Sequence, residues 1–419
     1  MDGIMDKAGL TGSATIAFED RFCARNYKPL PVVVTHAKGA WIWAEDGRRY
    51  LDMMSAYSAV NVGHGHPRIL KALTEQAEKV AVVSRAFHTD KLGPFLAKVC
   101  ELTGLDGACP MNSGAEAVET AIKAARRWGY TVKGIPAGQA EIVVAEGNFH
   151  GRTTTIVSFS SEADYRDGFG PFTPGFRIVP YGDAAALEAA IGPNTAAVLL
   201  EPIQGEAGIV VPPEGYLKAV RALCDHHNVL MVLDEIQSGL GRTGKWFAHQ
   251  HEGIRPDAMC LGKALGGGVM PVSAFVARRD VIDVFKPGNH GSTFGGNPLA
   301  AAVGLESLRV IEEERLVERS AELGEHMAAR IRAIRSPLVK GVRGKGLWLG
   351  VEIDPAYATA RAVVEELMTH GVLSKETHET VIRFAPPLVI ERADLDWAID
   401  RFEETLRALE PSAGRRGVA

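Results

Sequence analysis

Short apolar runs alternate with amphipathic segments through the middle of the chain. Each run is bounded by glycine, proline or a charged residue, and five of them lie at residues 141–146, 196–201, 229–234, 258–261 and 272–277. Apolar runs of this length are typical of strands that are buried on both faces of a parallel sheet. Residues 215–227, between two of the runs, have apolar positions at helical spacing. The pattern therefore predicts strand–helix–strand units and an α/β fold.

The last third of the chain has a different order of elements. Residues 299–334 form a long, periodic and charge-rich run, which predicts one helix that connects two parts of the molecule. Strand-like runs at 339–353 and 379–390 flank a helical run at 358–370, and a final helix is predicted over 395–409. This order indicates a smaller α+β unit after the large α/β unit.

Composition and charge exclude several classes of protein. Of the 419 residues, 46% are hydrophobic and 23% are charged, so the chain has enough apolar area to fold and is not disordered. Lysine and arginine number 46 against 51 aspartates and glutamates, which gives no reason to expect nucleic acid or an anionic membrane as a partner. No apolar stretch reaches the roughly 18 residues that a membrane span needs. The five cysteines lack C-x-x-C spacing and the N-terminus resembles no signal or transit peptide, so we expect reduced cysteines, no metal and a cytoplasmic location.

A stretch of small residues precedes a predicted helix. Residues 110–117 read PMNSGAEA, and a helical run follows at 118–128. Free backbone N–H groups and a partial positive charge at a helix start favour a bound phosphate. Ser113 and Glu116 also have the spacing of an ordinary capping box, which is the commoner explanation of such a stretch on its own.

Two predicted strands end in groups that are costly to bury. Asp234 ends the run at 229–234, where a carboxylate needs a cationic partner; a helix cap or an ion pair with a local arginine explains it equally well. Lys263 follows the run at 258–261 and precedes three glycines. Burial lowers the pKa of an ammonium group, and a neutral amine is a nucleophile toward aldehydes. A surface lysine at a turn is the alternative.

One ligand would satisfy all three features. It would carry a phosphate, a group that needs a carboxylate, and an aldehyde that reacts with a lysine. Pyridoxal phosphate has these three groups, and an aspartate at its ring nitrogen keeps the ring protonated, so that the ring can accept electrons from a carbanion.

Nine sequence blocks resemble those of one enzyme family. The chain is similar, from about residue 17 to 409, to the class III (subgroup II, ω-type) aminotransferases of the fold-type I pyridoxal-phosphate enzymes, and within them to the ornithine aminotransferases. The blocks are AYSAVNVGHGHP (56–67), RRWGYTVKGI (126–135), GNFHGRT (147–153), DGFGPFTPGF (167–176), EPIQGEAGIVVP (201–212), LDEIQSGLGRTG (233–244), GKALGGG (262–268), HGSTFGGNP (290–298) and IRFAPPLVI (382–390).

This resemblance implies an architecture and an assembly. It implies a large cofactor-binding domain with a mainly parallel central sheet over residues 66–316, and a small α+β domain over 317–419. The N-terminal segment, residues 1–65, would pack with the small domain. It also implies a homodimer whose active site lies at the subunit interface.

The resemblance further assigns roles to individual residues of this chain. Lys263 matches the Schiff-base lysine and Asp234 the partner of the ring nitrogen, and both would be catalytic. The other positions that match cofactor contacts are Ser113, Gly114, Ala115, Phe149, Gln237 and Thr293, the last reaching the phosphate of the neighbouring subunit. The positions that match substrate contacts are Tyr27, Tyr57, Arg152, Glu206 and Arg383. His150 falls at a position that varies in the family, and we leave it out of the expected site.

The activity that this match implies is transfer of the δ-amino group of L-ornithine to 2-oxoglutarate, in arginine and proline metabolism. Another ω-amine as donor (N-acetylornithine, 4-aminobutyrate or lysine), a mutase, and a cofactor-binding regulator that has lost catalysis are the alternatives. We also expect Glu206 to cover Arg383 while ornithine reacts. Two other motifs carry little weight: residues 239–245 fit G-x-x-x-x-G-K, but Trp246 stands where a P-loop has a hydroxyl. His64 and His66 lack a third metal ligand at useful spacing.

Overall fold

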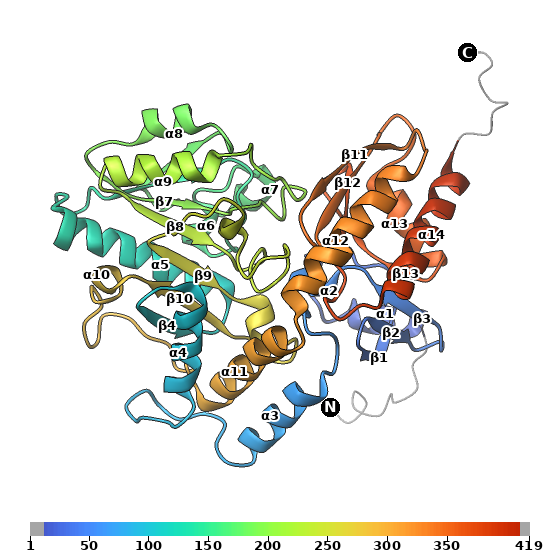
Figure 1. The fold of residues 1–419 in the computed structure, drawn as a ribbon, viewed down its shortest axis with the longest axis horizontal. Coiled ribbons are helices and arrows are strands. Elements are labelled where there is room, and N and C mark those ends of the chain that lie inside the picture. Colours follow the sequence, from blue (N-terminus) through green and yellow to red (C-terminus); the bar gives the residue numbers. More distant parts are fainter. Residues whose placement is uncertain (1–11, 411–419) are drawn as a thin grey trace.

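The largest sheet lies in the middle third of the chain and matches the predicted α/β unit. The computed structural model describes residues 12–410, and Figure 1 shows its ribbon. Seven strands follow the order β4 (Gly107–Met111), β10 (Ser273–Ala277), β9 (Ala258–Leu261), β8 (Leu230–Asp234), β7 (Thr195–Leu200), β5 (Glu141–Ala145) and β6 (Phe176–Val179). All neighbours in this sheet pair in parallel except β10, which is antiparallel to both β4 and β9. The expectation of a mainly parallel central sheet is therefore confirmed.

The sheet differs from the prediction at three strands. The run at 272–277 was expected to be parallel and is antiparallel, because a parallel return needs a crossover of a dozen residues or more, and the connection from β9 holds only the short 3-10 turn η3 (Lys263–Gly266). The two edge strands, β4 and β6, were not predicted. Pro110 lies inside β4, and β6 is half exposed, so neither has the continuous apolar pattern of an inner strand.

Helices cover both faces of this sheet because successive residues of a strand point to opposite sides. In β7, Leu199 packs in the cluster formed with α5 (Gly114–Trp128). The neighbouring Val198 belongs instead to the larger core cluster, which contains residues of α9 (Tyr216–His226), α4 (Leu92–Thr103) and α11 (Pro298–Glu313). The remaining helices of the first three hundred residues are α1 (Ser13–Glu19), α2 (Ser55–Ser58), α3 (Pro67–Ala77), η1 (Gly129–Lys133), α6 (Thr154–Val157), α7 (Ala163–Arg166), α8 (Ala184–Ala190), η2 (Ala248–His251) and α10 (Arg279–Ile282).

The single connecting helix expected over 299–334 is two helices. Helix α11 ends at Glu313 and α12 (Leu316–Ala333) begins after Arg315, whose φ of 53° is left-handed. A left-handed residue ends a right-handed helix. No glycine or proline marks this position in the sequence, so the apolar period runs across it. Helix α11 packs against η3, whereas α12 packs against α14 (Arg392–Leu409), so the pair connects the two parts of the molecule.

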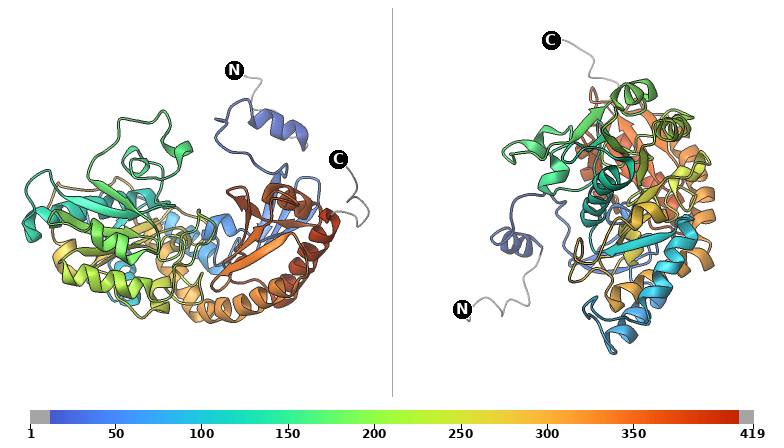
Figure 2. Two further views of the ribbon diagram at one scale, coloured as in Figure 1. Left: turned by 90° about the horizontal axis from the view of Figure 1, so that it is seen from above. Right: turned by 90° about the vertical axis from the view of Figure 1, so that its left-hand side faces the viewer.

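The C-terminal part is the expected α+β unit. Its antiparallel sheet has the order β11 (Val339–Gly344), β12 (Leu349–Ile353), β15 (Val381–Phe384) and β14 (Lys375–Thr377), with α13 (Ala360–Thr369) and α14 packed beside it. A third sheet joins the N-terminal strands β1 (Val34–Lys38), β2 (Trp41–Ala44) and β3 (Arg49–Asp52) to β13 (Val372–Leu373). Figures 1 and 2 show this blue N-terminal region beside the red C-terminal helices. The domain limits at residues 65 and 316 stay predictions.

None of the helices within residues 12–410 has both the length and the apolar character to cross a bilayer.

Candidate active site

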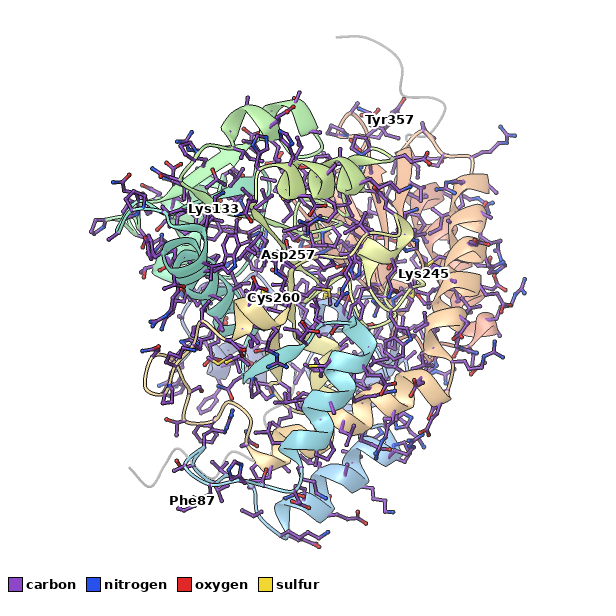
Figure 3. The ribbon with its side chains drawn as sticks, turned by 60° about the vertical axis from the view of Figure 1, so that its left-hand side comes forward. Phe87, Lys133, Lys245, Asp257, Cys260 and Tyr357 are labelled. Atoms are coloured by element: carbon purple, nitrogen blue, oxygen red, sulfur yellow. The ribbon has the colours of Figure 1, made fainter. Side chains whose placement is uncertain are left out.

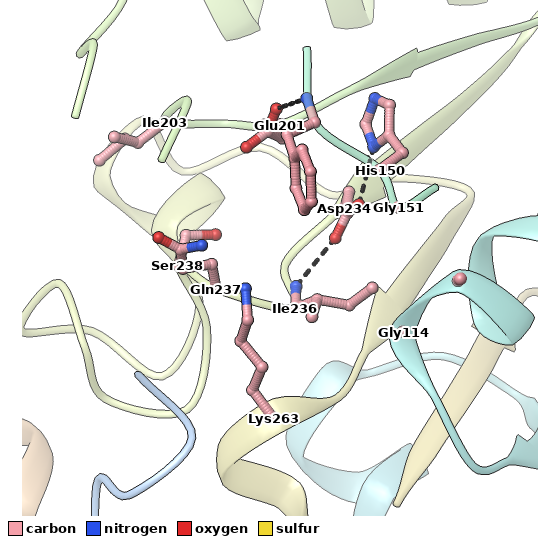
Figure 4. Close-up of a pocket in the computed structure, with 12 residues that line it drawn as sticks. Gly114, His150, Gly151, Glu201, Ile203, Asp234, Ile236, Gln237, Ser238 and Lys263 are labelled. Atoms are coloured by element: carbon pink, nitrogen blue, oxygen red, sulfur yellow. Dashed lines mark hydrogen bonds and ion pairs between the residues drawn. The ribbon is translucent and has the colours of Figure 1, made fainter. Parts of the chain in front are cut away.

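One cavity lies where the parallel strands of the large sheet end. It has a volume of about 190 Å³, and Figure 4 shows the side chains around it. Its walls come from the segments that follow β4, β5, β7, β8 and β9, at the sheet edge where α/β proteins bind ligands. Six of the predicted residues line it: Gly114, Ala115, Phe149, Asp234, Gln237 and Lys263. The other lining residues are His150, Gly151, Glu201, Ile203, Ile236 and Ser238.

The start of α5 forms one wall of the cavity. Ser113 is the N-cap, and its hydroxyl accepts a hydrogen bond from the Glu116 N–H while the Glu116 carboxylate accepts one from the Ser113 N–H at 2.7 Å. The capping box is therefore present, and it leaves the next two amides, those of Gly114 and Ala115, without an intrahelical acceptor. Both residues line the cavity. A Cβ atom at Gly114 would lie 3.0 Å from the Ile236 side chain, so a larger residue here would push Ile236, which also lines the cavity.

Asp234 ends β8 with its carboxylate in the cavity wall, and its side chain is 5% exposed. One oxygen accepts the Ile236 N–H at 3.0 Å, and the other lies 2.7 Å from Nδ1 of His150. Within residues 12–410, no lysine or arginine pairs with this carboxylate. The alternative of a local arginine is therefore wrong, and among the described residues the carboxylate has no lysine or arginine partner that would compete with a cationic ligand.

His150 belongs to the site, although the sequence interpretation left it out. Its imidazole is buried against Asp234, and Nε2 has no hydrogen-bond partner among the described residues. Burial lowers the pKa of the imidazole, but the hydrogen bond and the charge of Asp234 outweigh burial and raise it. The imidazole therefore holds the aspartate in one orientation. Its place between Phe149 and Gly151, in the block that supplies two expected site residues, was the signal available in the sequence.

Lys263 begins η3 and extends into the cavity (Figure 4). Its φ of 48° is left-handed, a strained conformation that is concentrated at functional sites. In the described part of the chain, no ion pair or hydrogen bond holds its amine. Burial lowers the pKa of this amine, partly opposed by Glu206, Asp234 and Glu201. The arrangement leaves a lysine amine available to react with a carbonyl group.

Glu201 is a second residue that the sequence interpretation missed. It follows β7, and its carboxylate accepts the Phe149 N–H at 2.8 Å and the Gly205 N–H at 3.1 Å. It therefore fixes both the segment that carries Phe149 and the loop that carries Glu206. Burial raises the pKa of this carboxyl to about 7. Its position at the end of an apolar strand, like that of Asp234, was the available signal.

Three of the predicted substrate residues lie together beside the cavity. Arg383, on β15, donates from Nη1 to Oε1 of Glu206 at 2.8 Å, and its guanidinium lies 4.7 Å from the centre of the Tyr57 ring. The Gln237 amide reaches the same glutamate oxygen at 3.4 Å. Burial alone would raise the pKa of Glu206, but Arg383 and Lys263 lower it below its usual value. The glutamate is therefore ionised and pairs with the arginine.

Tyr57 is placed by an unusual turn. The four residues of α2, Ser55–Ser58, all have positive φ, and a left-handed turn of this kind is unfavourable for residues other than glycine. Asp52 stabilises it by accepting the N–H groups of Met54 and Ser55 at 2.8 and 2.9 Å. Backbone strain of this kind is typical of functional sites.

The remaining predicted residues lie farther out. Arg152 is exposed, and its guanidinium lies 4.4 Å from the ring centre of Tyr165 and 5.8 Å from that of Phe149. Tyr27 is 75% exposed, and its influence on the pKa of Tyr57 places it nearby. Thr293 is exposed and does not line the cavity. The structure of one chain therefore does not bring Tyr27 and Thr293 into the cavity.

The donors of the cavity fit pyridoxal phosphate. The unused amides at the start of α5 suit a phosphate, Asp234 suits a protonated ring nitrogen, and the unpartnered amine of Lys263 suits an aldehyde. Phe149 and Gln237 also line the cavity in which such a ring would lie. The two histidines of the HGH motif serve elsewhere: His64 pairs with Asp52 at 2.8 Å and His66 with Glu314 at 3.1 Å.

Comparison with known proteins agrees with this geometry. The aminotransferase class-III family model matches residues 22–406. The ornithine aminotransferase of Halalkalibacterium halodurans is 58% identical over 94% of this chain and 98% of its own, and that of Bacillus subtilis is 58% identical over 92% and 95%. The solved ornithine aminotransferase of Toxoplasma gondii, which has pyridoxal phosphate at partial occupancy at its active site, is 44% identical with a TM-score of 0.94 over 96% and 95% of the two chains. An acetylornithine aminotransferase of Elizabethkingia anophelis is 49% identical with a TM-score of 0.88, over 96% of this chain and all of its own.

Proposed function

The chain belongs to the class III aminotransferases, and we propose that it transfers the δ-amino group of L-ornithine to 2-oxoglutarate, with pyridoxal phosphate as cofactor. The products are glutamate 5-semialdehyde and glutamate. The observation that carries this proposal is the Glu206–Arg383 ion pair beside the cavity that holds the unpartnered Lys263 amine. The identity of 56–58% to several bacterial ornithine aminotransferases supports the choice of donor.

Different residues of the cavity bind the cofactor and transfer protons. When bound, pyridoxal phosphate supplies an aldehyde that takes up amino groups and a ring that accepts electrons from the substrate carbon. Gly114 and Ala115 would hold the phosphate with their amides, and Asp234, oriented by His150, would keep the proton on the ring nitrogen. The amine of Lys263 would hold the cofactor while no substrate is bound. The same amine then removes a proton from the substrate carbon and returns one, as a general base and acid.

Arg383 and Arg152 allow one site to accept ornithine and 2-oxoglutarate in turn. While ornithine reacts, Glu206 neutralises Arg383, so that the α-carboxylate of ornithine is not drawn toward the reacting carbon. When 2-oxoglutarate enters, Glu206 leaves Arg383 free for the α-carboxylate, and Arg152 binds the distal carboxylate. Tyr57, which faces Arg383, and Tyr27 are the expected contacts of the α-end of ornithine. A site that hydrogen-bonds one end of its substrate discriminates strongly against an analogue without that group.

N-acetylornithine is the second candidate donor, because an acetylornithine aminotransferase shares 49% identity and the fold over nearly the whole chain. Acetylation removes the positive charge of the α-amino group and leaves the δ-amine unchanged. The two donors therefore differ only at the end that Tyr27 and Tyr57 would contact.

We also propose a homodimer with its active sites at the subunit interface. Thr293 and Phe294 lie exposed on the loop that follows α10, although Thr293 matches a cofactor contact made across the interface, and Phe87 is a further exposed aromatic (Figure 3).

Light scattering on the purified enzyme should give twice the chain mass, and a monomer with full activity would contradict the shared site. A cytoplasmic location is consistent with five unpaired cysteines.

Initial rates with a panel of amines test the function. Ornithine, N-acetylornithine, 4-aminobutyrate and lysine are each offered at several concentrations with 2-oxoglutarate, and glutamate formation is measured. We expect the highest kcat/KM for ornithine, with transfer of the δ-amine. If kcat/KM is higher for N-acetylornithine than for ornithine, the proposed donor is wrong and N-acetylornithine is the donor.

A further inference from the structure

Each of the two arginines assigned to substrate carboxylates lies over a tyrosine ring. Arg383 lies 4.7 Å from the centre of the Tyr57 ring, and Arg152 lies 4.4 Å from that of Tyr165. The two arginines differ in whether a carboxylate pairs with them. Glu206 neutralises Arg383, whereas no carboxylate within residues 12–410 pairs with Arg152. Arg152 is therefore a cation that is held by the side chains of Tyr165 and Phe149 and not by a carboxylate.

Tyr165 is not among the residues that the family resemblance assigned. It lies on α7, in the segment that follows α6 and stands out from the large sheet in Figure 2. The side chain is half-buried, and its ring packs edge-on against Phe149 with the centroids 6.0 Å apart and the planes at 72°. Tyr165 thus contacts both the expected distal-carboxylate arginine and the expected ring-stacking phenylalanine.

An aromatic face holds a guanidinium group without neutralising it. The negative face of the ring attracts the cation, and the flat guanidinium stacks on it, which restricts both its position and its plane. The N–H groups at the guanidinium edge stay free, and two of them match the two oxygens of a carboxylate. A glutamate in place of the ring would occupy those N–H groups, as Glu206 does for Arg383.

The phenol of Tyr165 stays protonated beside this cation. Burial raises the pKa of the hydroxyl, and the charge of Arg152 and its hydrogen bond with the Tyr165 side chain only partly oppose that rise. The charged groups that act on this side chain come from three segments, namely Arg152 after β5, Glu206 after β7 and Glu162 beside α7. A neutral phenol adds no charge that would repel a carboxylate.

We propose that Tyr165 is a positioning residue for the distal carboxylate of 2-oxoglutarate, because its side chain holds the Arg152 guanidinium in a fixed plane while no carboxylate of the described residues occupies the N–H edge. This inference rests on the proposed function, which assigns Arg152 to that carboxylate. It extends the function by naming the residue that prepares the arginine for a dicarboxylate. Ornithine has no carboxylate at its reacting end, so its half-reaction does not use this arrangement.

Binding of glutarate to the holoenzyme tests the inference without requiring the enzyme to turn over. Glutarate has the two carboxylates of 2-oxoglutarate and no oxo group, and pentanoate lacks the distal carboxylate. Calorimetry is run on the wild type, Tyr165→Leu and Tyr165→Phe. The matched control is Tyr357→Leu, a half-buried tyrosine of the C-terminal part (Figure 3). Tyr165→Leu should raise the Kd for glutarate about 2- to 30-fold, the range of a cation–π contact. Tyr165→Phe should retain most of the affinity, and pentanoate binding should stay unchanged in every variant.

Steady-state kinetics give the second readout. In Tyr165→Leu, the KM for 2-oxoglutarate should rise by the same factor as the Kd for glutarate, with the KM for ornithine unchanged. A merely structural role would raise both KM values or weaken pentanoate as much as glutarate, and either result would overturn the inference. The two claims can fail separately. If Tyr165→Leu loses affinity for glutarate but the wild type does not use ornithine, the role of Tyr165 is upheld and the proposed function is contradicted.

A double-mutant cycle separates coupling from loop damage. Arg152→Lys keeps the positive charge but removes the flat guanidinium that stacks on the ring. If Tyr165 acts through Arg152, adding Tyr165→Leu to Arg152→Lys should weaken glutarate binding no further, because the contact is already lost. Additive losses in the double variant would show that Tyr165 acts independently of Arg152 and would overturn the inference.

Discussion

Replacing Glu206 with glutamine should change which amine of ornithine reacts. Oε1 of Glu206 accepts the Arg383 guanidinium at 2.8 Å, and the two side chains are only 22% and 5% exposed. Glutamine has the same shape and no charge, so it leaves Arg383 with an uncompensated positive charge next to the cavity. The α-carboxylate of ornithine would then be attracted to Arg383, which brings the α-amine toward the reacting position.

The size of the effect follows from the strength of the pair. A hydrogen bond to a charged group is worth about 1.5–3 kcal/mol. At 1.4 kcal/mol for each factor of ten, this corresponds to a selectivity change of about 10- to 150-fold. Because both side chains are mostly buried, solvent screens the pair little. We therefore expect the preference for the δ-amine over the α-amine to fall by roughly this factor.

Single-turnover experiments separate the two half-reactions. The pyridoxal form of the enzyme is mixed with ornithine, and products of δ- and α-transfer are quantified by mass spectrometry; a second experiment follows glutamate in the same way. Glu206→Gln should lower δ-selectivity and leave the glutamate half-reaction unchanged or faster, since Arg383 is permanently uncovered. Glu214→Gln is the control, because Glu214 is exposed on the same loop after β7 and forms no recorded ion pair within the described residues.

Equal slowing of the ornithine and glutamate half-reactions in Glu206→Gln, with unchanged δ-selectivity, would refute the switch. Glu206 would then stabilise Arg383 in the same way whether ornithine or glutamate is bound.

Three further predictions follow from the cavity. Lys263→Ala should give a folded protein without transaminase activity, and borohydride reduction of the wild type followed by mass spectrometry should place the cofactor label on Lys263; a label on another lysine would contradict the assignment. His150→Gln should keep cofactor content but lower turnover about 10- to 100-fold, as loss of a partner that orients a ligand does, and unchanged turnover would show that Asp234 needs no orientation. The pKa of the Glu201 carboxyl is raised to about 7 in the fold, from 4.5, so the folded state binds the proton more tightly. Relative to Glu201→Gln, the wild type should therefore lose unfolding free energy as pH rises from 4.5 to 7, by up to about 3 kcal/mol, measured by urea denaturation; a flat difference over that range would contradict the raised pKa.

The sequence predicts two of the three charged site residues that end apolar strands, and it misses the third, Glu201, although the same signal was present. Asp234 and Lys263 each follow a continuous apolar run, and the geometry of a parallel sheet brings the ends of such runs to one edge. His150 and Tyr165 could not be found in this way, because neither ends a strand and each acts through the side chain it contacts. That contact depends on the path of the loop after β5, and no periodic pattern encodes this path.

The same distinction explains the errors in the fold. The inner strands of the large sheet were predicted within a residue or two, because burial on both faces demands a continuous apolar run. The direction of β10 depends on the length of its connection, and the break at Arg315 depends on one backbone angle. Neither feature changes the pattern of apolar positions, so neither was predicted.

The charged groups around the cavity are arranged so that one remains unsatisfied. Each carboxylate has its own partner: Glu206 pairs with Arg383, Asp234 with His150, and Glu201 with backbone amides. A buried charge without a partner is costly, and the ion pair with Arg383 is what keeps the pKa of Glu206 low, whereas the backbone amides leave the pKa of Glu201 raised to about 7. Lys263 lies among all three carboxylates, yet within residues 12–410 none of them comes within ion-pair distance of its amine. Because an ion pair would hold that amine protonated, its isolation keeps the nucleophile available, and the pairing of the other groups is what secures that isolation.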